Sequence, residues 1–298
     1  MAQTRRLLPY YIRHPVEAVG AFILYWFFRL LPLGAAAGLG GFLGRAIGPR
    51  LKVSSRAVRN LAAAFPDKDA GEIAVIVRDM WDNLGRVAGE YPHLDRFDLY
   101  TDGGRVQVEG AEIIDQLRTD GKPGIFFSGH LANWELSSLA ITQRGLPLDQ
   151  VYRAANNPYL EWVYRRRQDA VGGALIPKGA KGAKELLQAM KDGRHVGMLV
   201  DQKMNDGIPV PFFGRDAMTA PALAQMALRY DCPVVPVRIE RTQGSRFRVT
   251  ISTPLTPEQT GDRHRDISAF MERINGLLED WIRERPGQWL WVHRRWPD

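Results

Sequence analysis

Residues 124–142 read GIFFSGHLANWELSSLAIT, and this stretch decides the fold. Its first part, Gly124–Phe127, has the length and bulk of a buried strand, and it ends abruptly in the polar turn Ser-Gly-His130. The following Leu131–Thr142 favours a helix, because apolar residues recur at helical spacing. A strand, a short loop and a helix in this order form the repeating unit of α/β proteins.

The same alternation continues on both sides of this unit. Further strands are predicted at Val106–Val108, Gln150–Tyr152, Ala174–Ile176, Val196–Val200, Val234–Ile239 and Phe247–Ile251. Helices are predicted at Ser54–Ala64, Asp69–Ala88, Pro158–Ala170, Ala183–Asp192, Ala220–Tyr230 and Arg265–Arg283. We therefore expect an α/β fold with a mostly parallel central sheet flanked by helices and a late antiparallel pair of strands. No linker or internal repeat interrupts residues 51–298, which we interpret as one domain.

The amino-terminal residues 1–50 have a different character. From Ala18 to Gly44 the chain carries one charge, Arg29, and Pro32 falls in the middle of the stretch. The stretch is long enough for one membrane-spanning helix, which needs roughly 20 apolar residues. Two shorter helices meeting near Pro32, as a re-entrant or interfacial hairpin, fit equally well. Basic residues on both sides favour this membrane-associated helical segment over a buried core helix or a cleaved signal peptide.

Composition narrows the classes of partner. Of 298 residues, 45% are hydrophobic and 24% charged, which is typical of a globular protein. The single cysteine, Cys232, excludes a disulfide framework and a cysteine-based zinc site, and its apolar surroundings predict a small core residue. The net charge of +7 comes with 32 Arg against 8 Lys, which indicates anionic partners. No nucleic-acid-binding module accompanies this charge, so anionic lipid or an acidic protein is expected rather than nucleic acid.

Polar side chains follow three of the predicted strands at the point where each ends. His130 follows the first, Arg153 the second, and Asp201 with Gln202 the third. Ligands of open α/β sheets bind at the carboxyl ends of the strands. We therefore expect these side chains to converge on one site.

His130 and Glu135 are the strongest candidates for catalysis. If His130 lies on the loop and Glu135 in the first turns of the helix, the carboxylate can contact the imidazole. It would then fix the tautomer and raise the basicity of the other ring nitrogen, which makes His130 a general base. Backbone N–H groups at the helix start could stabilise a developing oxyanion.

Other interpretations of these residues stay open from the residues alone. His130 can be an ordinary loop histidine, with Glu135 favoured in the first turn by the helix dipole. A metal-dependent hydrolase would use His130 and Glu135, but no third or fourth ligand lies near them in the sequence, and His195 and Asp201 would have to be recruited from elsewhere. Ser128 does not lie in the Gly-x-Ser-x-Gly turn of a serine nucleophile. We expect no metal and no cofactor.

Several ordered blocks carry a resemblance to a known family. The block Ser-Gly-His130-x4-Glu135 resembles the His-x4-Asp/Glu motif of the glycerolipid-type acyltransferases. Within that superfamily the chain is similar to the lipid A biosynthesis acyltransferases that add lauroyl or myristoyl chains. The supporting blocks, in the order of that family, are Arg59–Pro66, Val151–Pro158, Val200–Gln202, Val210–Gly214, Val234–Val237 and Trp289–Arg295. The resemblance runs from about residue 10 to the end of the sequence.

The resemblance implies roles for individual residues. His130 and Glu135 correspond to the catalytic dyad. The residues assigned to substrate binding or support of the site are Arg153, Asp201, Gln202, Asn133 and Pro236. The Glu-Gly-x-Arg block of the wider superfamily is absent, and Asp201-Gln202 stands in its place, which makes a simple glycerol-phosphate acyltransferase less consistent with the chain.

The function implied by the resemblance is an O-acyltransferase at the cell inner membrane, with the catalytic domain, residues 51–298, on the cytoplasmic side. It would move a fatty acyl chain from acyl carrier protein to a hydroxyl of a lipid A precursor. The candidate docking charges for these anionic partners are Arg165–Arg167, Lys178, Lys181, Lys184, Arg294 and Arg295. The alternatives are an acyltransferase acting on another glycolipid or a lysophospholipid, and a catalytically silent lipid-binding membrane protein.

Overall fold

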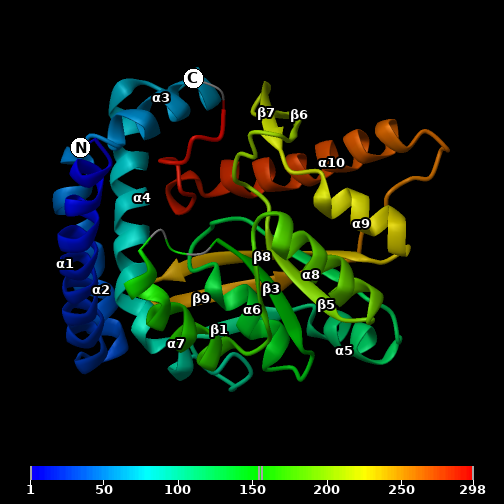
Figure 1. Cartoon of the computed structure of the whole chain (residues 1–298), viewed down its shortest axis with the longest axis horizontal. Coiled ribbons are helices and arrows are strands. Elements are labelled where there is room, and N and C mark those ends of the chain that lie inside the picture. Colours follow the sequence, from blue (N-terminus) through cyan, green and yellow to red (C-terminus); the bar gives the residue numbers. More distant parts are fainter. Residues whose placement is uncertain (1, 154, 156, 297–298) are drawn as a thin grey trace.

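A seven-stranded sheet forms the centre of the protein (Figure 1). The computed structural model describes residues 2–153, 155 and 157–296, without the side chains of residues 2–10, 180 and 181. The strand order is β1-β9-β8-β2-β5-β3-β4. The strands are β1 (Val106–Glu109), β2 (Ile125–Ser128), β3 (Leu148–Tyr152), β4 (Leu175–Pro177), β5 (His195–Leu199), β8 (Val234–Gln243) and β9 (Arg246–Ile251).

The pairing of these strands confirms the predicted α/β class. The pairs β1/β9, β2/β8, β2/β5, β3/β5 and β3/β4 are parallel, whereas β8 and β9 form the late antiparallel pair. The central strand β2 is buried on both faces, as the apolar run of its sequence predicts. Ile125 and Phe127 face one hydrophobic core and Phe126 faces the other.

Helices cover both faces of the sheet. The core on the Phe126 side includes residues of α5 (Ala111–Thr119) and α6 (Glu135–Thr142). The core on the Phe127 side includes residues of α8 (Ala180–Lys191), α9 (Ala222–Tyr230) and α10 (Arg263–Glu284). The helix α7 (Glu161–Val171) follows β3. The helix α5 was not predicted. The helix α6 begins four residues later than predicted, because the loop before Glu135 is also apolar.

A two-stranded hairpin, β6 (Ile208–Phe212) and β7 (Arg215–Thr219), was not predicted. Pro209 and Pro211 disrupt the usual strand signature of β6. Proline cannot donate to a β-ladder, but a two-stranded ribbon leaves alternate N–H groups outside the ladder and tolerates it there.

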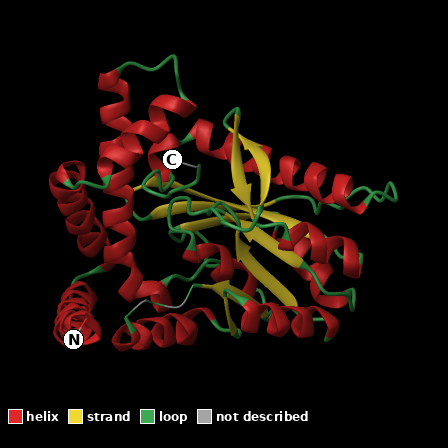
Figure 2. Ribbon diagram, turned by 45° about the horizontal axis from the view of Figure 1, so that its top comes forward, coloured by secondary structure: helices red, strands yellow, loops and turns green. Residues whose placement is uncertain are grey.

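The four amino-terminal helices lie beside the sheet (Figure 2). They are α1 (Ala2–Leu30), α2 (Leu33–Ile47), α3 (Ser54–Ala64) and α4 (Ala70–Glu90). The helical structure is interrupted at Leu31 and Pro32, between α1 and α2. A pair of helices that meet near Pro32 was one of the two expected forms. The backbones of α2 and α4 touch at Gly40 and Gly85: a Cβ on Gly40 would lie 2.1 Å from the carbonyl oxygen of Gly85.

The surface of α1 carries large apolar side chains that no other element covers. Six of its exposed apolar residues recur every three or four positions and so form a stripe: Ile12, Val16, Val19, Ile23, Phe27 and Leu30. Within the described part of the chain, no helix combines the length and the apolarity that crossing a bilayer requires. A membrane-spanning segment within Ala18–Gly44 is therefore not confirmed.

Candidate active site

The ends of two adjacent parallel strands bring His130 and Asp201 together. Ser128, the last residue of β2, is in register with Leu199, the last residue of β5. The backbone N–H of Val200 continues the pairing by donating to the carbonyl of Ser128, 3.0 Å away. His130 and Asp201 each follow the paired strands by two residues, so they lie side by side, 71 positions apart in sequence.

Asp201 holds His130 at two points. One carboxylate oxygen, Oδ1, accepts from Nδ1 of the His130 ring at 2.8 Å. The other, Oδ2, accepts from the backbone N–H of His130 at 2.8 Å. Burial alone would raise the pKa of Asp201, but the charge of His130 and the hydrogen bonds from its ring and backbone hold that pKa well below its usual range. The carboxylate is therefore ionised and can only accept, so Nδ1 of His130 donates to it, and in the neutral imidazole Nε2 carries the lone pair.

A second chain of hydrogen bonds reaches the other nitrogen of His130. Nε2 of His130 lies 3.3 Å from the side-chain nitrogen of Gln202. The side-chain oxygen of Gln202 accepts from the ammonium group of Lys178 at 3.2 Å. An ammonium group only donates, so it fixes the Gln202 amide with its NH2 end toward His130. Both ends of the chain therefore select the same tautomer of His130.

The segment after α10 completes the site, which the sequence interpretation did not anticipate. The indole N–H of Trp289 donates to Oδ2 of Asp201 at 2.7 Å. His293 lies against His130, with ring centroids 5.1 Å apart. Burial, reinforced by repulsion from His130, lowers the pKa of His293 to about 4, so this ring is neutral at pH 7. The carbonyls of Trp291 and His293 accept from Asn60, which joins the family-like blocks at the two ends of the chain.

Glu135 was expected to pair with His130, but its carboxylate has other partners. It is the first residue of α6, and its carboxylate pairs with the guanidinium of Arg167 and accepts from the indole of Trp134 at 3.1 Å. Arg167 also donates to the side-chain oxygen of Gln150. Within the described residues no hydrogen bond joins Glu135 to His130. Asp201 takes the position that the sequence interpretation gave to Glu135, because strand register brings it closer than the adjacent helix does.

Asn133 and Pro236, predicted to bind substrate, lie away from the solvent. Asn133 is fully buried and donates to Glu90, which pairs with Arg241. This buried network fixes the loop between β2 and α6. Pro236 lies within β8, in register with Phe127 of β2, and it is buried in the sheet.

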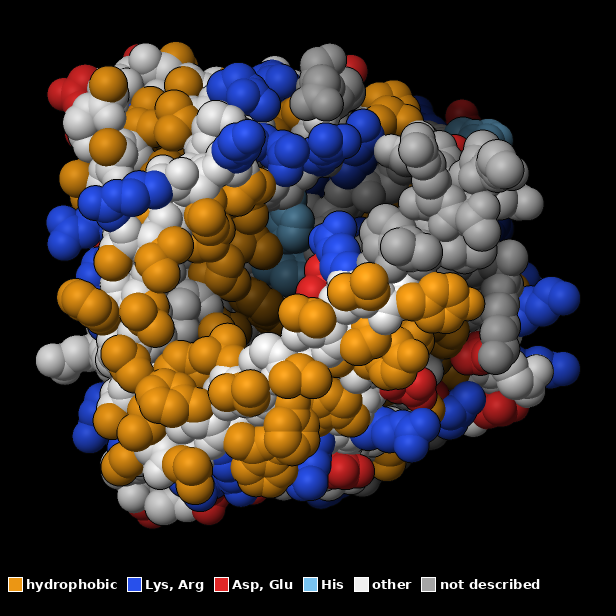
Figure 3. All heavy atoms as spheres, turned by 60° about the vertical axis from the view of Figure 1, so that its left-hand side comes forward, with side chains coloured by type: hydrophobic (Ala, Val, Ile, Leu, Met, Phe, Trp, Pro, Cys, Tyr) orange, Lys and Arg blue, Asp and Glu red, His pale blue; other side chains and the backbone are white. Residues whose placement is uncertain are grey.

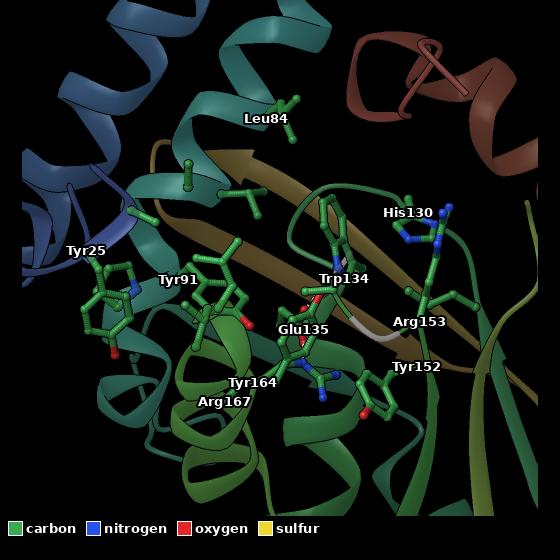
Figure 4. A pocket seen from close by; sticks show the side chains of 18 of the residues that line it. Tyr25, Leu84, Tyr91, His130, Trp134, Glu135, Tyr152, Arg153, Tyr164 and Arg167 are labelled. Carbon is green, nitrogen blue, oxygen red and sulfur yellow. Dashed lines mark hydrogen bonds and ion pairs between the residues drawn. The ribbon is translucent and has the colours of Figure 1, made fainter. Parts of the chain in front are cut away.

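An elongated cavity of about 740 Å³ opens beside His130. Figure 4 shows His130 at one end and Tyr25 at the other, with Trp134, Glu135 and Tyr91 between them. The wall is apolar over most of its length; it includes Ala21, Leu24, Tyr25 and Phe28 of α1, Leu84, Val87 and Ala88 of α4, and Leu160, Val163 and Tyr164 near and on α7. Figure 3 shows a hollow in this face, with hydrophobic side chains around much of the rim and Lys and Arg side chains along one edge.

The cavity gathers four of the predicted site residues. His130, Glu135, Arg153 and Gln202 all line it, and Asp201 supports His130 from behind. Arg153 follows the last residue of β3, and its side chain is exposed at the cavity mouth. Lys178, which follows β4, lines the same mouth.

Of the predicted docking charges, Arg295 is buried and Arg167 is only partly exposed. Arg295 is fully buried and binds the carbonyl of Met218 and the side chains of Thr219 and Asn275. Arg167 is held by Glu135 inside the cavity wall. Arg295 and Arg167 are therefore not available to an acidic partner, contrary to the prediction. Arg165 is exposed, whereas the side chain of Lys181 lies outside the described part.

The two side chains considered as nucleophiles, Cys232 and Ser128, both lie inside the protein. Cys232 is buried, and burial raises the pKa of its thiol to about 12, which confirms it as a core residue. Ser128 is also buried. Among the side chains that the structure describes, no three of His, Cys, Asp or Glu type are grouped so as to hold a metal ion.

The chain is similar in sequence to known bacterial proteins. Residues 10–298 match the family model described as bacterial lipid A biosynthesis acyltransferase. The lipid A biosynthesis myristoyltransferase of Escherichia coli (strain K12) is 25% identical over 255 residues, covering 84% of this chain and 77% of that protein. The lipid A biosynthesis palmitoleoyltransferase of the same organism is 26% identical, covering 91% and 87%.

A solved structure also matches. It is the 1-acyl-sn-glycerophosphate acyltransferase of Thermotoga maritima. The match covers 96% of this chain and 100% of that chain. The sequence identity is 13% and the TM-score 0.40.

Proposed function

Because the chain belongs to the family of bacterial lipid A biosynthesis acyltransferases, we propose that it transfers a fatty acyl chain from an acyl carrier protein thioester to a hydroxyl of a lipid A precursor. The observation that carries the proposal is the position of His130. Its free Nε2 lies at one end of a long apolar cavity, where a reacting carbonyl at the head of an acyl chain would lie. A cavity of about 740 Å³ is within the range of ~300–1,000 Å³ typical of ligand sites.

The chemistry begins with the acceptor hydroxyl. Nε2 of His130 takes the hydroxyl proton, and the imidazolium that forms is stabilised by the buried carboxylate of Asp201. The hydroxyl oxygen attacks the thioester carbon directly. The described residues of the cavity offer no activated nucleophile, so an acyl-enzyme intermediate is not part of the proposal.

The apolar wall supports the assignment of the acyl chain to this cavity. Residues from α1, α4 and α7 surround the space between His130 and Tyr25, and burying each methylene of an acyl chain there is worth about 0.8 kcal/mol. The helix α1 therefore contributes directly to the proposed acyl site.

The cavity mouth supports anionic substrates. Arg153 and Lys178 emerge from adjacent strands β3 and β4 beside His130. A phosphate of the acceptor or of the donor arm would meet both cations. Because lysine lacks the bidentate fork of arginine, Arg153→Lys should raise KM or lower kcat although the charge is kept.

Donor and acceptor are tested by one assay with purified enzyme. Acyl carrier protein and coenzyme A thioesters are compared as donors. The acceptors are a diphosphorylated disaccharide with free 3-hydroxyacyl chains, a mannosylated phosphatidylinositol, a lysophospholipid and glycerol 3-phosphate. We expect fast transfer from acyl carrier protein to the disaccharide. Equal rates with both donors, or preference for another acceptor, would overturn the assignment, and no transfer to any acceptor would favour a silent lipid-binding protein.

Membrane association belongs to the same proposal. The exposed stripe of α1, which includes Val16, Ile23 and Leu30, offers apolar side chains to the interface of the inner membrane, with the catalytic domain on the cytoplasmic side. The basic residues near the helix ends would meet anionic lipid.

Flotation with vesicles of anionic lipid tests this attachment. The variant Val16→Ser/Ile23→Ser/Leu30→Ser should bind the vesicles less than wild type, while Val75→Ser, an exposed apolar residue on α4, should bind normally. A truncated chain that begins near Arg50 should lose part of its binding. Full release of wild type by high salt alone would contradict apolar insertion.

A further inference from the structure

The side chain of Gln202 lies beside Nε2 of His130, at the end of the cavity where the proposed function has the acyl donor react. Its NH2 group faces Nε2 of His130 at 3.3 Å, which is long for a hydrogen bond and therefore easily exchanged for another partner. The acceptor hydroxyl must approach the same nitrogen to give up its proton. When it does so, it displaces the Gln202 amide by a short distance.

The displaced Gln202 amide can donate to the carbonyl oxygen of the acyl donor. The carbonyl carbon under attack must lie about 3–3.5 Å from the hydroxyl oxygen, so its own oxygen lies close to the position that the amide has left. Gln202 lines the cavity together with His130, so both side chains reach the bound donor.

The backbone N–H groups of residues 130–132, which lie nearest to the base, already have acceptors inside the protein. The N–H of His130 donates to Asp201 at 2.8 Å. The N–H of Leu131 donates to the carbonyl of Gly129 at 2.8 Å, and the N–H of Ala132 donates to that of Gln288 at 2.9 Å. Three successive N–H groups beside the base are therefore engaged inside the protein, whereas the Gln202 amide faces the base from the cavity.

Lys178 makes Gln202 a stronger donor. Its ammonium group holds the side-chain oxygen of Gln202 at 3.2 Å, which draws electron density from the amide and points its N–H groups at the reaction centre. Loss of hydration, with repulsion from Arg153, lowers the pKa of Lys178, although Asp201 acts in the opposite direction.

From this arrangement we propose that Gln202 is a catalytic residue that donates a hydrogen bond to the oxyanion formed from the acyl donor, and that Lys178 is its positioning residue. The inference rests on the proposed function, because it takes His130 as the base of acyl transfer.

The step is balanced without any further reagent. The hydroxyl proton passes to Nε2 of His130, and an oxygen electron pair forms the new C–O bond. The π pair of the carbonyl moves to its oxygen, which accepts from the Gln202 N–H. When the carbonyl re-forms, the C–S bond breaks, its electron pair leaves with sulfur, and the thiolate takes the proton from His130.

Steady-state kinetics of four variants test the proposal: Gln202→Met, Gln202→Glu, Lys178→Met and the double variant Lys178→Met/Gln202→Met. Removing one oxyanion donor typically lowers kcat about 10²–10³-fold, which we expect for Gln202→Met with little change in KM. Gln202→Glu keeps the shape and loses the N–H donor, so it should be at least as slow. Lys178→Met should lower kcat roughly 10-fold by the weaker polarisation of the amide.

The double variant separates positioning from an independent role. If Lys178 acts through Gln202, the double variant should be no slower than Gln202→Met alone. Lys191→Met removes an exposed cation at the other end of α8 and should leave kcat unchanged, and thermal unfolding should show that every variant is folded.

Three outcomes would overturn the inference: normal kcat in Gln202→Glu, a rise in KM alone in Gln202→Met, or losses that multiply in the double variant. If His130→Ala is inactive while Gln202→Met is fully active, the proposed function stands and only this inference fails. If His130→Ala remains active, the proposed function fails first.

Discussion

The two ends of the cavity are built in opposite ways. At the His130 end, side chains from the sheet edge are held by directional hydrogen bonds, and Asp201 alone accepts from the His130 ring, the His130 backbone and Trp289. At the Tyr25 end, side chains from helices form an apolar wall with few directional contacts. The directional hydrogen bonds fix one geometry, which chemistry needs. The apolar wall fixes only a volume, which an acyl chain needs.

Asp201→Asn should produce the largest effect, because it removes the carboxylate that accepts hydrogen bonds from His130. An amide can donate to Nδ1 of His130 and would move the ring proton to Nε2, where it blocks the base. Activity should fall by roughly 10²–10⁴, close to the loss in His130→Ala. Kinetics with Asp206→Asn, an exposed neighbour on the same loop, provide the control. Near-normal activity of Asp201→Asn would show that His130 does not depend on its ring partner.

Glu135→Gln should have a smaller effect on rate and a larger one on stability. Glu135 is paired with Arg167 in the cavity wall, and breaking a buried ion pair costs about 3–5 kcal/mol. The free energy of unfolding measures this loss, and Glu161→Gln, which breaks an exposed pair on α7, should cost far less. If Glu135 instead acts on His130, as its spacing suggests, Glu135→Gln should not slow Asp201→Asn any further. We expect the two losses of rate to multiply.

His293 should make stability depend on pH below neutrality. Its ring stays neutral in the folded protein down to about pH 4, while in the unfolded chain it takes up a proton near 6.5. The unfolded state therefore binds more protons in this window, and stability falls as pH is lowered from 6.5 to 4, by at most about 3 kcal/mol from this residue.

Chemical unfolding across pH measures the effect. His293→Gln should flatten the slope between pH 4 and 6.5, but not abolish it, because burial also lowers the pKa of His93 and His195. The exposed His264→Gln should leave the slope unchanged. An unchanged slope in His293→Gln would contradict a buried, neutral ring.

Tyr25→Ala should have the smallest effect, because it alters only the apolar end. Removing the ring enlarges the cavity at the far end from His130, so longer acyl donors should gain a few-fold in kcat/KM relative to shorter ones. Competition between donors of different length measures the ratio, with Val75→Ala as the control. A uniform loss with every donor would mean that the chain does not reach Tyr25.

The fold was more readily predicted than the site because its signals are local. The apolar strands and the helices between them carry their own periodicity, and the strands that were not predicted are those of the β6/β7 hairpin, where Pro209 and Pro211 disrupt the pattern. The partner of His130 depends instead on the register between β2 and β5. Sequence proximity favoured Glu135, although His130 and Asp201 were both expected to converge at the strand ends. Nothing in the sequence pattern indicated that Trp289 would bind Asp201.

The contact between Trp289 and Asp201 also orders events in time. Trp289 and His293 follow every strand and α10 in chain order. During synthesis, the sheet and the apolar cavity can therefore form before the ribosome has made the residues that complete the surroundings of the catalytic carboxylate. A nascent chain at that stage would still lack Trp289, which binds the carboxylate behind His130. Acyl transfer would begin only after the segment beyond α10 has been translated and packed onto the strand ends.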